Sequence, residues 1–279
     1  MTRCLAVAFA LLLACSANAA ERKLERTFDV SPGGTLTVDS DSASVRVSGG
    51  DTNQVTVRMS ARGSEGDLDD AKLEAVQTDR GVTVTLRQRK NNWFNWGSWT
   101  REASIEVTVP RRYVIDVRTS GGSVELTDTT GTAALRSSGG SVVAKNVNGN
   151  VEARTSGGGI HAENIRGDID AATSGGSVRL LNIDGRIRGK TSGGSVECSL
   201  VGENRGISAT TSGGSVRVTV PRATRGNLDA TTSGGSINSD LPVTATSQQN
   251  GQLKGAINGG GQPIDAHTSG GSISLRAAN

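Results

Sequence analysis

The sequence predicts an all-β protein, a β-solenoid in which coils of ~18 residues stack as two flattened sheets of parallel strands, resembling a parallel β-helix. Ser-Gly-Gly recurs at intervals of 18, 18, 18, 18, 20, 21 and 36 residues, and such a fixed period is typical of solenoids. The chain also has 38 glycines and only 3% aromatic residues, which suits a narrow core with many tight turns. The eight copies begin at Ser120, Ser138, Ser156, Ser174, Ser192, Ser212, Ser233 and Ser269.

Each copy predicts two short strands, one on either side of the Ser-Gly-Gly corner. Mostly apolar residues stand five and three positions before the serine, and this spacing of two indicates a strand with one face in the core. A β-branched residue stands four positions after the serine in every copy, as stacked strands prefer. The two best columns are Ile115, Ala133, Val151, Ile169, Ile187, Ile207, Leu228 and Ile264, and Val124, Val142, Ile160, Val178, Val196, Val216, Ile237 and Ile273.

Glycine pairs form one corner of each coil, and we expect them to supply the positive φ angles that a sharp reversal needs. The other corner is also glycine-dependent and includes Asn148-Gly149 and Arg166-Gly167. A threonine or serine precedes each Ser-Gly-Gly with the parity of the core columns. We therefore expect an inward ladder of hydroxyl groups that bond one another and the corner backbone. The corner pairs are Gly121, Gly122, Gly139, Gly140, Gly157, Gly158, Gly175, Gly176, Gly193, Gly194, Gly213, Gly214, Gly234, Gly235, Gly270 and Gly271.

A left-handed hexapeptide β-helix is a competing architecture, because 18 is a multiple of six. Steps of six residues from Ile169 reach Gly175 and then Leu181, so the apolar phase of that architecture is absent. A rise of ~4.8 Å per coil predicts a rod of about nine coils and ~45 Å. We interpret the 36-residue interval as two periods that contain one degenerate copy.

Residues 20–110 predict a degenerate β region ahead of the repeats in residues 111–279. Short segments such as 45–47, 82–84 and 105–107 alternate as half-buried strands do. Residues 66–77 are the exception, because three aspartates precede apolar residues as in the first turn of a short helix. We interpret this helix as a cap over the open end of the solenoid.

An aromatic cluster within residues 91–100 is the most conspicuous feature outside the repeat. It holds all three tryptophans of the chain. Tryptophan combines a large apolar area with one hydrogen-bond donor, which suits a loop that binds a sugar, a protein or a membrane interface. A hydrophobic lid over the end of the solenoid explains the cluster equally well, and both interpretations are open. The candidate residues are Trp93, Phe94, Trp96 and Trp99.

Residues 1–19 predict a secretory signal peptide, with Arg3 before an apolar run at 5–14 and a small-residue cleavage site at 17–19. The run is too short to span ~30 Å of bilayer, so we expect an exported, periplasmic or secreted chain without a transmembrane segment. A lipoprotein acylated at Cys15 is the alternative. Ordinary cleavage would remove Cys4 and Cys15 with the signal peptide and leave Cys198 as the one cysteine of the mature chain. Its core column predicts a small buried hydrophobe.

Charge and motifs exclude several classes of function. The formal net charge is +3 over 279 residues and the basic residues are dispersed, so we expect no nucleic-acid partner. The sequence lacks a nucleophile elbow, a phosphate-binding loop, a metalloprotease motif and a calcium-binding nonapeptide. His161 and His267 stand in different coils, without ligands at metal-binding spacing. We therefore expect no catalytic residue, no cofactor and no metal site.

Two outward columns carry opposite charges. An acidic column contains Asp116, Glu152, Asp170 and Asp265, and the basic column beside it contains Arg118, Arg136, Arg154 and Lys190. A cross-strand ion ladder is the simpler interpretation and a groove for a polyanion is the alternative. Some β-helix enzymes cleave polysaccharides with paired carboxylates, but Asp168, Asp170 and Asp184 fit that role poorly because the basic column would neutralise Asp170.

The layout resembles the bacterial "putative adhesin" β-strand-repeat family, a domain of unknown function in exported and membrane-associated proteins. The resemblance is carried by Phe28-Asp29-Val30 with Gly33-Gly34, by residues 105–110, and by residues 116–124 with their repeats. It covers nearly all of the mature chain. It implies the fold and no catalytic residue, and it suggests adhesion only through the name. The aromatic cluster is not part of the pattern.

These features favour an exported, non-enzymatic solenoid that presents an adhesion-like binding surface in the cell envelope. One alternative is a polysaccharide-active β-helix enzyme. Another is an envelope scaffold or stress-related protein that binds a second envelope protein. The sequence does not identify the partner, and an envelope protein and a glycan are the two candidates.

Overall fold

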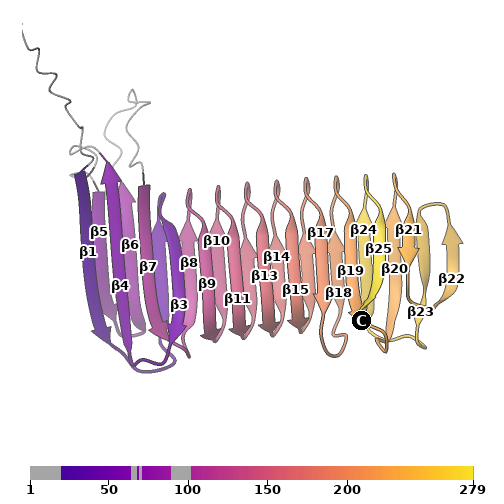
Figure 1. The fold of residues 1–279 in the computed structure, drawn as a ribbon, viewed down its shortest axis with the longest axis horizontal. Helices are drawn as coiled ribbons and strands as arrows, with labels where there is room; N and C mark the ends of the chain where they lie inside the picture. Colours follow the sequence, from indigo (N-terminus) through magenta and orange to yellow (C-terminus); the bar gives the residue numbers. More distant parts are fainter. Residues whose placement is uncertain (1–19, 64–67, 69–70, 89–101, 279) are drawn as a thin grey trace, which may run out of the picture.

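The computed structural model describes residues 20–63, 68, 71–88 and 102–278. Two β-sheets face each other along a rod, and successive coils stack side by side along its axis (Figure 1). All 25 strands of the described residues lie in these two sheets. The predicted flattened two-sheet solenoid is therefore confirmed. The predicted signal peptide and aromatic cluster lie outside the described residues.

The sheets have 12 and 13 strands and are called sheet A and sheet B. Sheet A runs in the order β1 (Ala20–Asp29), β4 (Gln54–Gly63), β7 (Glu102–Pro110), β3 (Ser44–Gly50), β9 (Val124–Thr130), β11 (Val142–Asn148), β13 (Ile160–Arg166), β15 (Val178–Asp184), β17 (Val196–Leu200), β19 (Val216–Pro221), β25 (Ile273–Ala278) and β21 (Ile237–Ser239). Sheet B runs in the order β22 (Val243–Gln249), β23 (Gln252–Ile257), β20 (Gly226–Thr232), β24 (Pro263–Thr268), β18 (Ile207–Thr210), β16 (Ile187–Lys190), β14 (Ile169–Ala172), β12 (Val151–Arg154), β10 (Ala133–Ser137), β8 (Val114–Thr119), β2 (Thr35–Ser40), β6 (Gly81–Gln88) and β5 (Ala71–Thr78).

One continuous hydrophobic core lies between the sheets. Strands pair in parallel with equivalent residues in register, for example Val151 with Ile169 and Val142 with Ile160. The predicted core columns are consequently buried almost throughout, and only Ile237 near the C-terminal end of the stack is partly exposed. The core also includes residues of β4, β6 and β7, so the degenerate region extends the same sandwich. Sheets of 12 and 13 strands span ~53 to ~58 Å, which exceeds the predicted length because these strands join the stack.

Hydroxyl groups beside the Ser-Gly-Gly corner are buried, as the sequence predicts. Each donates to a corner carbonyl of the adjacent coil and not to another hydroxyl of the ladder. Thr173 Oγ1 lies 2.7 Å from the carbonyl oxygen of Gly158, and Thr191 Oγ1 lies 2.7 Å from that of Gly176. These bonds tie one coil to the next. The ladder consists of Thr119, Ser137, Thr155, Thr173, Thr191, Thr211, Thr232 and Thr268.

The second glycine of each Ser-Gly-Gly copy is needed for close approach of the backbone. A Cβ atom on Gly176 would lie 2.3 Å from the carbonyl oxygen of Gly158, and one on Gly140 would lie 2.1 Å from that of Gly122. None of the glycines in these pairs has a positive φ. The predicted reason, positive φ, is therefore wrong at this corner. At this second glycine, successive corners stack backbone on backbone and leave no room for a side chain.

The opposite corner does use positive φ, at 152° for Gly149 and 147° for Gly167. Beside it runs a ladder of side-chain amides that the sequence analysis did not identify. Asn146, Asn164 and Asn182 all have φ near 55°, an unusual conformation that asparagine tolerates best. Nδ2 of Asn164 donates to Oδ1 of Asn146 at 3.0 Å, and Nδ2 of Asn182 donates to Oδ1 of Asn164 at 3.1 Å. The amides therefore satisfy one another along the stack.

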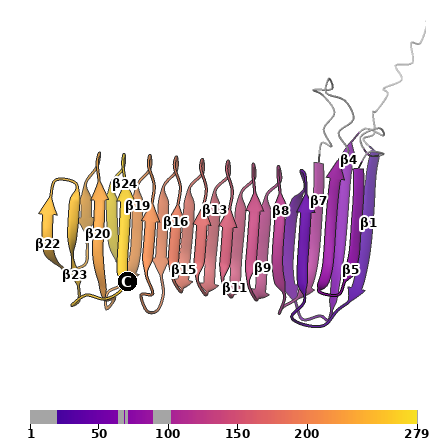
Figure 2. The same cartoon turned by 180° about the vertical axis from the view of Figure 1, so that it is seen from behind.

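The coil formed by β24 and β25 and the coil formed by β2 and β3 both lie inside the stack. At the C-terminal end, β24 pairs with β18 and β20, and β25 pairs with β19 and β21. At the N-terminal end, β2 pairs with β6 and β8, and β3 pairs with β7 and β9. Figures 1 and 2 show yellow β24 and β25 inboard of β20 and β21. Spatial order thus departs from chain order at both ends.

Two local predictions are wrong. From Ala71 on, the predicted helix at 66–77 is instead the strand β5, because Ala71 and Leu73 pair with Gln88 and Leu86 in an antiparallel hairpin; of the residues before it, only Leu68 is described. The segment does lie at the end of sheet B, where the predicted cap was expected. The predicted degenerate coil before Ser269 is the antiparallel hairpin of β22 and β23, turned at Asn250-Gly251, with φ of 77° at the glycine. No helix in the described part of the chain is long and apolar enough to cross a membrane.

Candidate binding surface on sheet B

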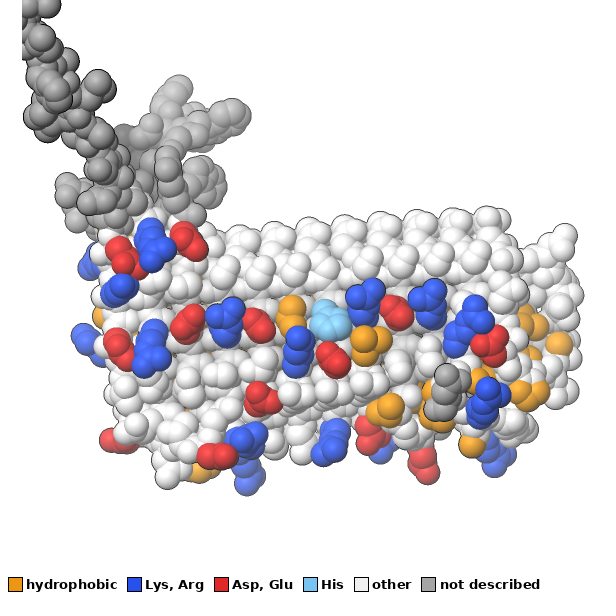
Figure 3. Space-filling model, in the orientation of Figure 1, with side chains coloured by type: hydrophobic (Ala, Val, Ile, Leu, Met, Phe, Trp, Pro, Cys, Tyr) orange, Lys and Arg blue, Asp and Glu red, His pale blue; other side chains and the backbone are white. Residues whose placement is uncertain are grey.

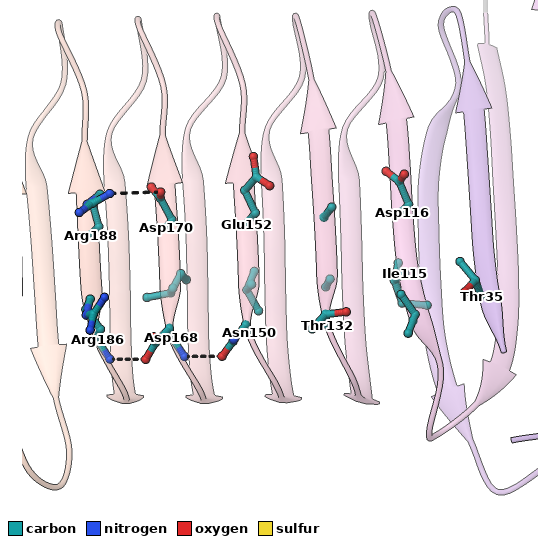
Figure 4. A pocket seen from close by; sticks show the side chains of 15 residues that line it. Thr35, Ile115, Asp116, Thr132, Asn150, Glu152, Asp168, Asp170, Arg186 and Arg188 are labelled. Carbon is teal, nitrogen blue, oxygen red and sulfur yellow. Dashed lines mark hydrogen bonds and ion pairs between the residues drawn. The ribbon is translucent and has the colours of Figure 1, made fainter. Parts of the chain in front are cut away.

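A groove of about 580 Å³ crosses the outer face of sheet B from β2 to β16. Two rows of outward side chains form its walls (Figure 4). The residue between the rows in each strand, such as Val151 or Ile169, points into the core, so backbone lines the floor. Five steps between neighbouring strands give the groove a length of ~24 Å. The walls include Asp116, Ala134, Glu152, Asp170 and Arg188 in one row, and Thr132, Asn150, Asp168 and Arg186 in the other.

The first wall is part of a chain of ion pairs with the predicted basic column. Arg136 lies 3.5 Å from Asp116 and 2.9 Å from Glu152, and its guanidinium thus spans the position of Ala134. Arg154 lies 3.5 Å from Glu152 and 2.8 Å from Asp170. Arg118 extends the chain at one end, 3.2 Å from Asp116, and Arg188 at the other, 3.9 Å from Asp170.

This chain of charges holds its members in place while leaving them accessible. Side chains of Arg136 and Arg154 are about one third exposed, at 35% and 36%. Pairs this exposed contribute little to stability, so their main effect is to fix the positions of the charged groups. The hydrogen bond with Asp170 raises the pKa of Arg154 above its usual value. Signs alternate along this chain of ion pairs, so its four arginines and three carboxylates nearly cancel.

Backbone-to-side-chain hydrogen bonds order the second wall. The amide of Asp168 donates to Oδ1 of Asn150 at 2.9 Å, and the amide of Arg186 donates to Oδ1 of Asp168 at 2.9 Å (Figure 4). A side-chain oxygen of one coil thus accepts a hydrogen bond from a backbone amide of the next coil. Thr132 lies in the same row, beside Ala134 of the first wall, so both walls have a small side chain at this coil.

One carboxylate oxygen in the groove lacks a hydrogen bond. Oδ1 of Asp116 is buried and accepts none from the described residues, although the guanidinium of Arg136 is 3.5 Å away. At 3.5 Å this contact is an ion pair but is too long for a charge-assisted hydrogen bond. A donor from a bound molecule would satisfy this oxygen.

Lys190 does not join the ion ladder that the sequence predicts. Its neighbours in the same row are Ala172 and Thr210, and no acidic side chain of the described residues pairs with it. The ladder ends because alanine replaces arginine at residue 172. The structure thus brings Arg118, Arg136 and Arg154 together along the groove and leaves Lys190 beyond it.

The three carboxylates considered for acid-base chemistry do not converge. Asp170 is bound by Arg154, and Asp168 accepts from the backbone of Arg186. Asp184 ends the sheet A strand β15, beside Gly202 and 3.9 Å from Arg205, and does not line the groove. No group of three His, Cys, Asp or Glu side chains within the described residues could hold a metal ion. Cys198 is fully buried, and burial raises its thiol pKa to about 12.

The outer face of sheet A offers a weaker candidate. Figure 3 shows rows of charged side chains crossing this face, with an edge of the rod above them that has neither charged nor hydrophobic side chains. Charges here also pair, as in Arg179 with Glu197 at 2.9 Å and Glu197 with Arg217 at 3.5 Å. His161, 3.5 Å from Glu163, lines a depression of about 420 Å³. That depression is smaller than the groove on sheet B.

Solved structures that align with most of this chain come from bacteria. A protein from Clostridium sporogenes described as a "putative cell adhesion protein" has 12% identity over 92% of this chain and 100% of its own, with a TM-score of 0.27. A "putative adhesin" from Bacteroides fragilis has 12% identity, coverage of 92% and 97%, and a TM-score of 0.38. A "putative lipid binding protein" from Parabacteroides distasonis has 15% identity, coverage of 91% and 96%, and a TM-score of 0.43. At these TM-scores none supports an argument about this chain.

No curated protein matches the chain. The model of the family described as Toastrack DUF4097 matches residues 34–276, which include every Ser-Gly-Gly copy and the groove. The resemblance to a repeat family of unknown function is thereby confirmed, and the chain belongs to the Toastrack DUF4097 family.

Proposed function

We propose that this chain is an exported, non-enzymatic binding module that holds an extended, uncharged, hydroxyl-rich polymer, a glycan strand, along the groove on sheet B. The observation that carries the proposal is the pair of ordered polar walls at a fixed spacing between strands. A linear polymer suits such a groove because every coil presents similar contacts at steps of ~4.8 Å.

The chemistry of the walls favours sugar hydroxyls. Carboxylate, guanidinium, amide and hydroxyl groups can all bond to a hydroxyl, which both donates and accepts. The buried Oδ1 of Asp116 needs a donor, and a hydroxyl supplies one. Because Arg136 and Arg154 are already paired with acidic groups, a polyanion would have to displace those partners. An uncharged glycan binds without that cost.

Non-enzymatic action and export are parts of the same proposal. The separation of Asp184 from Asp168 and Asp170 supports binding without cleavage. Residues 1–19 support export, because they have the features of a signal peptide. Amino-terminal sequencing of protein recovered from the cell envelope tests this part, with cleavage after Ala19 expected. A mature chain that begins at an acylated Cys15 would instead support the lipoprotein alternative.

Isothermal titration with a panel of soluble neutral and anionic polysaccharides tests the binding function. The variant Ala134→Arg replaces the smallest side chain of the first wall with a long, charged one. The matched control is Val143→Arg, an outward position in β11 of sheet A. We expect at least one neutral polysaccharide to bind, at least about tenfold more weakly to Ala134→Arg and unchanged in the control.

Three results would contradict the proposal. Equal loss in both variants would place the effect outside the groove. Binding restricted to anionic polysaccharides, and lost on charge reversal of Arg136 and Arg154, would favour the polyanion alternative. Shortening of the polysaccharide during the titration, detected by reducing-end release, would favour the enzyme alternative.

A further inference from the structure

The two ends of the rod have different edge strands. Figure 2 shows β1 and β5 at one end and β22 at the other. Each outermost strand has one unpaired backbone edge among the described residues, and such an edge can pair with another chain. β21, at the edge of sheet A beside β22, has only three residues and is too short to offer a ladder of its own.

Charge protects the edges at the N-terminal end. Six of the ten residues of β1 are charged, and β5 carries the ion pair of Lys72 with Glu74 at 2.8 Å. Pairing with another strand would desolvate these groups, which is a common way in which proteins block edge-to-edge association. In contrast, β22 has seven residues and no charge. Its threonine, serine and glutamine side chains can bond across a strand pair.

The shape of β22 restricts its partner. The pairing of β22 with β23 shifts register at Thr246, and such a bulge increases the local twist of the strand. A partner must match that twist along the whole edge. A second copy of β22 does so by symmetry, because an antiparallel pair across a twofold axis brings identical surfaces together. The charged β1 edge of another copy lacks this match.

We propose that β22 is a dimerisation edge, at which two copies of this chain pair antiparallel and join tail to tail. Sheet B then continues from one copy into the other. The charged edges of β1 and β5 remain at the outer ends, so the dimer does not grow into a filament. This inference is independent of the proposed glycan function, because the groove lies on the face of sheet B and ends at β16.

Sedimentation equilibrium of the mature chain over a wide range of concentration tests the proposal. We compare the unaltered chain with the double variant Thr244→Lys/Gln248→Lys, which adds charge at two exposed positions of β22. The matched control is Thr27→Lys, an exposed threonine in the edge strand at the opposite end. We expect a reversible dimer of the unaltered chain, a dimer dissociation constant at least about tenfold higher for the double variant, and no change for the control.

Circular dichroism melting establishes that the variants are folded, which the exposure of all three positions leads us to expect. Hydrogen exchange provides a second readout, since dimer formation should protect amides within residues 243–249 and leave those of β1 unchanged. A monomer at every concentration, or a dimer equally strong in the folded double variant, would overturn the proposal. Dimer loss on Thr27→Lys would assign the contact to the opposite end, and open-ended growth would exclude the closed tail-to-tail pair.

Discussion

Replacing the second glycine of one Ser-Gly-Gly copy, Gly176→Ala, should destabilise the protein much more than replacing the first. The added Cβ would lie 2.3 Å from the carbonyl oxygen of Gly158 and 2.5 Å from its carbonyl carbon. Both are backbone atoms of the adjacent coil, so no side-chain rotation relieves the contact. The equivalent Cβ on Gly175 would lie 3.0 Å from the carbonyl oxygen of Gly157, a tight contact that a small shift relieves.

The magnitude follows from the distances. Ordinary van der Waals contact starts at 3.4 Å, so the coils must separate by 1.1 Å, the difference between 3.4 and 2.3 Å. The same carbonyl accepts the 2.7 Å hydrogen bond of Thr173, which this movement would break. Overpacking costs ~1–3 kcal/mol and the hydrogen bond ~0.5–1.5 kcal/mol, about 3 kcal/mol together. For a chain of this size that lowers Tm by roughly 6–12 °C.

Thermal melting followed by circular dichroism compares Gly176→Ala with the control Gly175→Ala, for which we expect a loss of about 1 kcal/mol or less. The double replacement of both glycines with valine should be more severe than either. An unchanged Tm for Gly176→Ala, or equal losses for the two alanine variants, would refute direct stacking of the corner backbones.

Three further predictions concern single side chains. Burial raises the pKa of the Cys198 thiol to about 12, so it should not react with a thiol reagent in the native protein at neutral pH. It should react fully after denaturation. Fast labelling of the native protein would contradict its burial. Asn164→Ala should lower the free energy of unfolding in urea by roughly 1–3 kcal/mol, because it removes two side-chain hydrogen bonds of 3.0 and 3.1 Å and puts alanine at φ 57°. Asn164→Gly should lower it less, since glycine adopts this φ without strain. The reverse order would contradict the strain argument. The hydrogen bond with Lys254 lowers the pKa of Asp229, so this ion pair stabilises the fold above the carboxyl's ordinary pKa, and the stabilisation is lost as pH falls through the lowered pKa. Asp229→Asn should remove this contribution from the dependence of Tm on pH. The same Tm profile for both proteins would contradict the prediction.

The repeat made most of the sandwich predictable. Because coils stack in register, a column such as Val142, Ile160 and Val178 in the sequence is a column in space. The threonine ladder followed from the same parity. The groove was only partly predictable. The acidic and basic columns were evident, but the way Arg136 bridges Asp116 and Glu152 across Ala134 and the unbonded oxygen of Asp116 depend on side-chain geometry.

Other features had signals that the 18-residue pattern obscured. Ala71, Leu73 and Ala75 alternate with charged residues, the period of a strand, whereas the preceding aspartates suggested a helix. Asn250-Gly251 is a strong hairpin signal within the supposed degenerate coil. Asn146, Asn164 and Asn182 recur every 18 residues. The inboard position of the terminal coils had no local signal, because coils that share one pattern can stack on one another in any order.

Binding of a neutral polysaccharide by three forms of the mature chain tests the central claim most directly. These are the unaltered chain, Ala134→Arg in the groove, and the triple replacement of Trp93, Trp96 and Trp99 with alanine. The account predicts that affinity falls at least about tenfold in Ala134→Arg and is retained in the tryptophan variant. Retention in Ala134→Arg with loss in the tryptophan variant would contradict it and would move the binding site to the aromatic cluster.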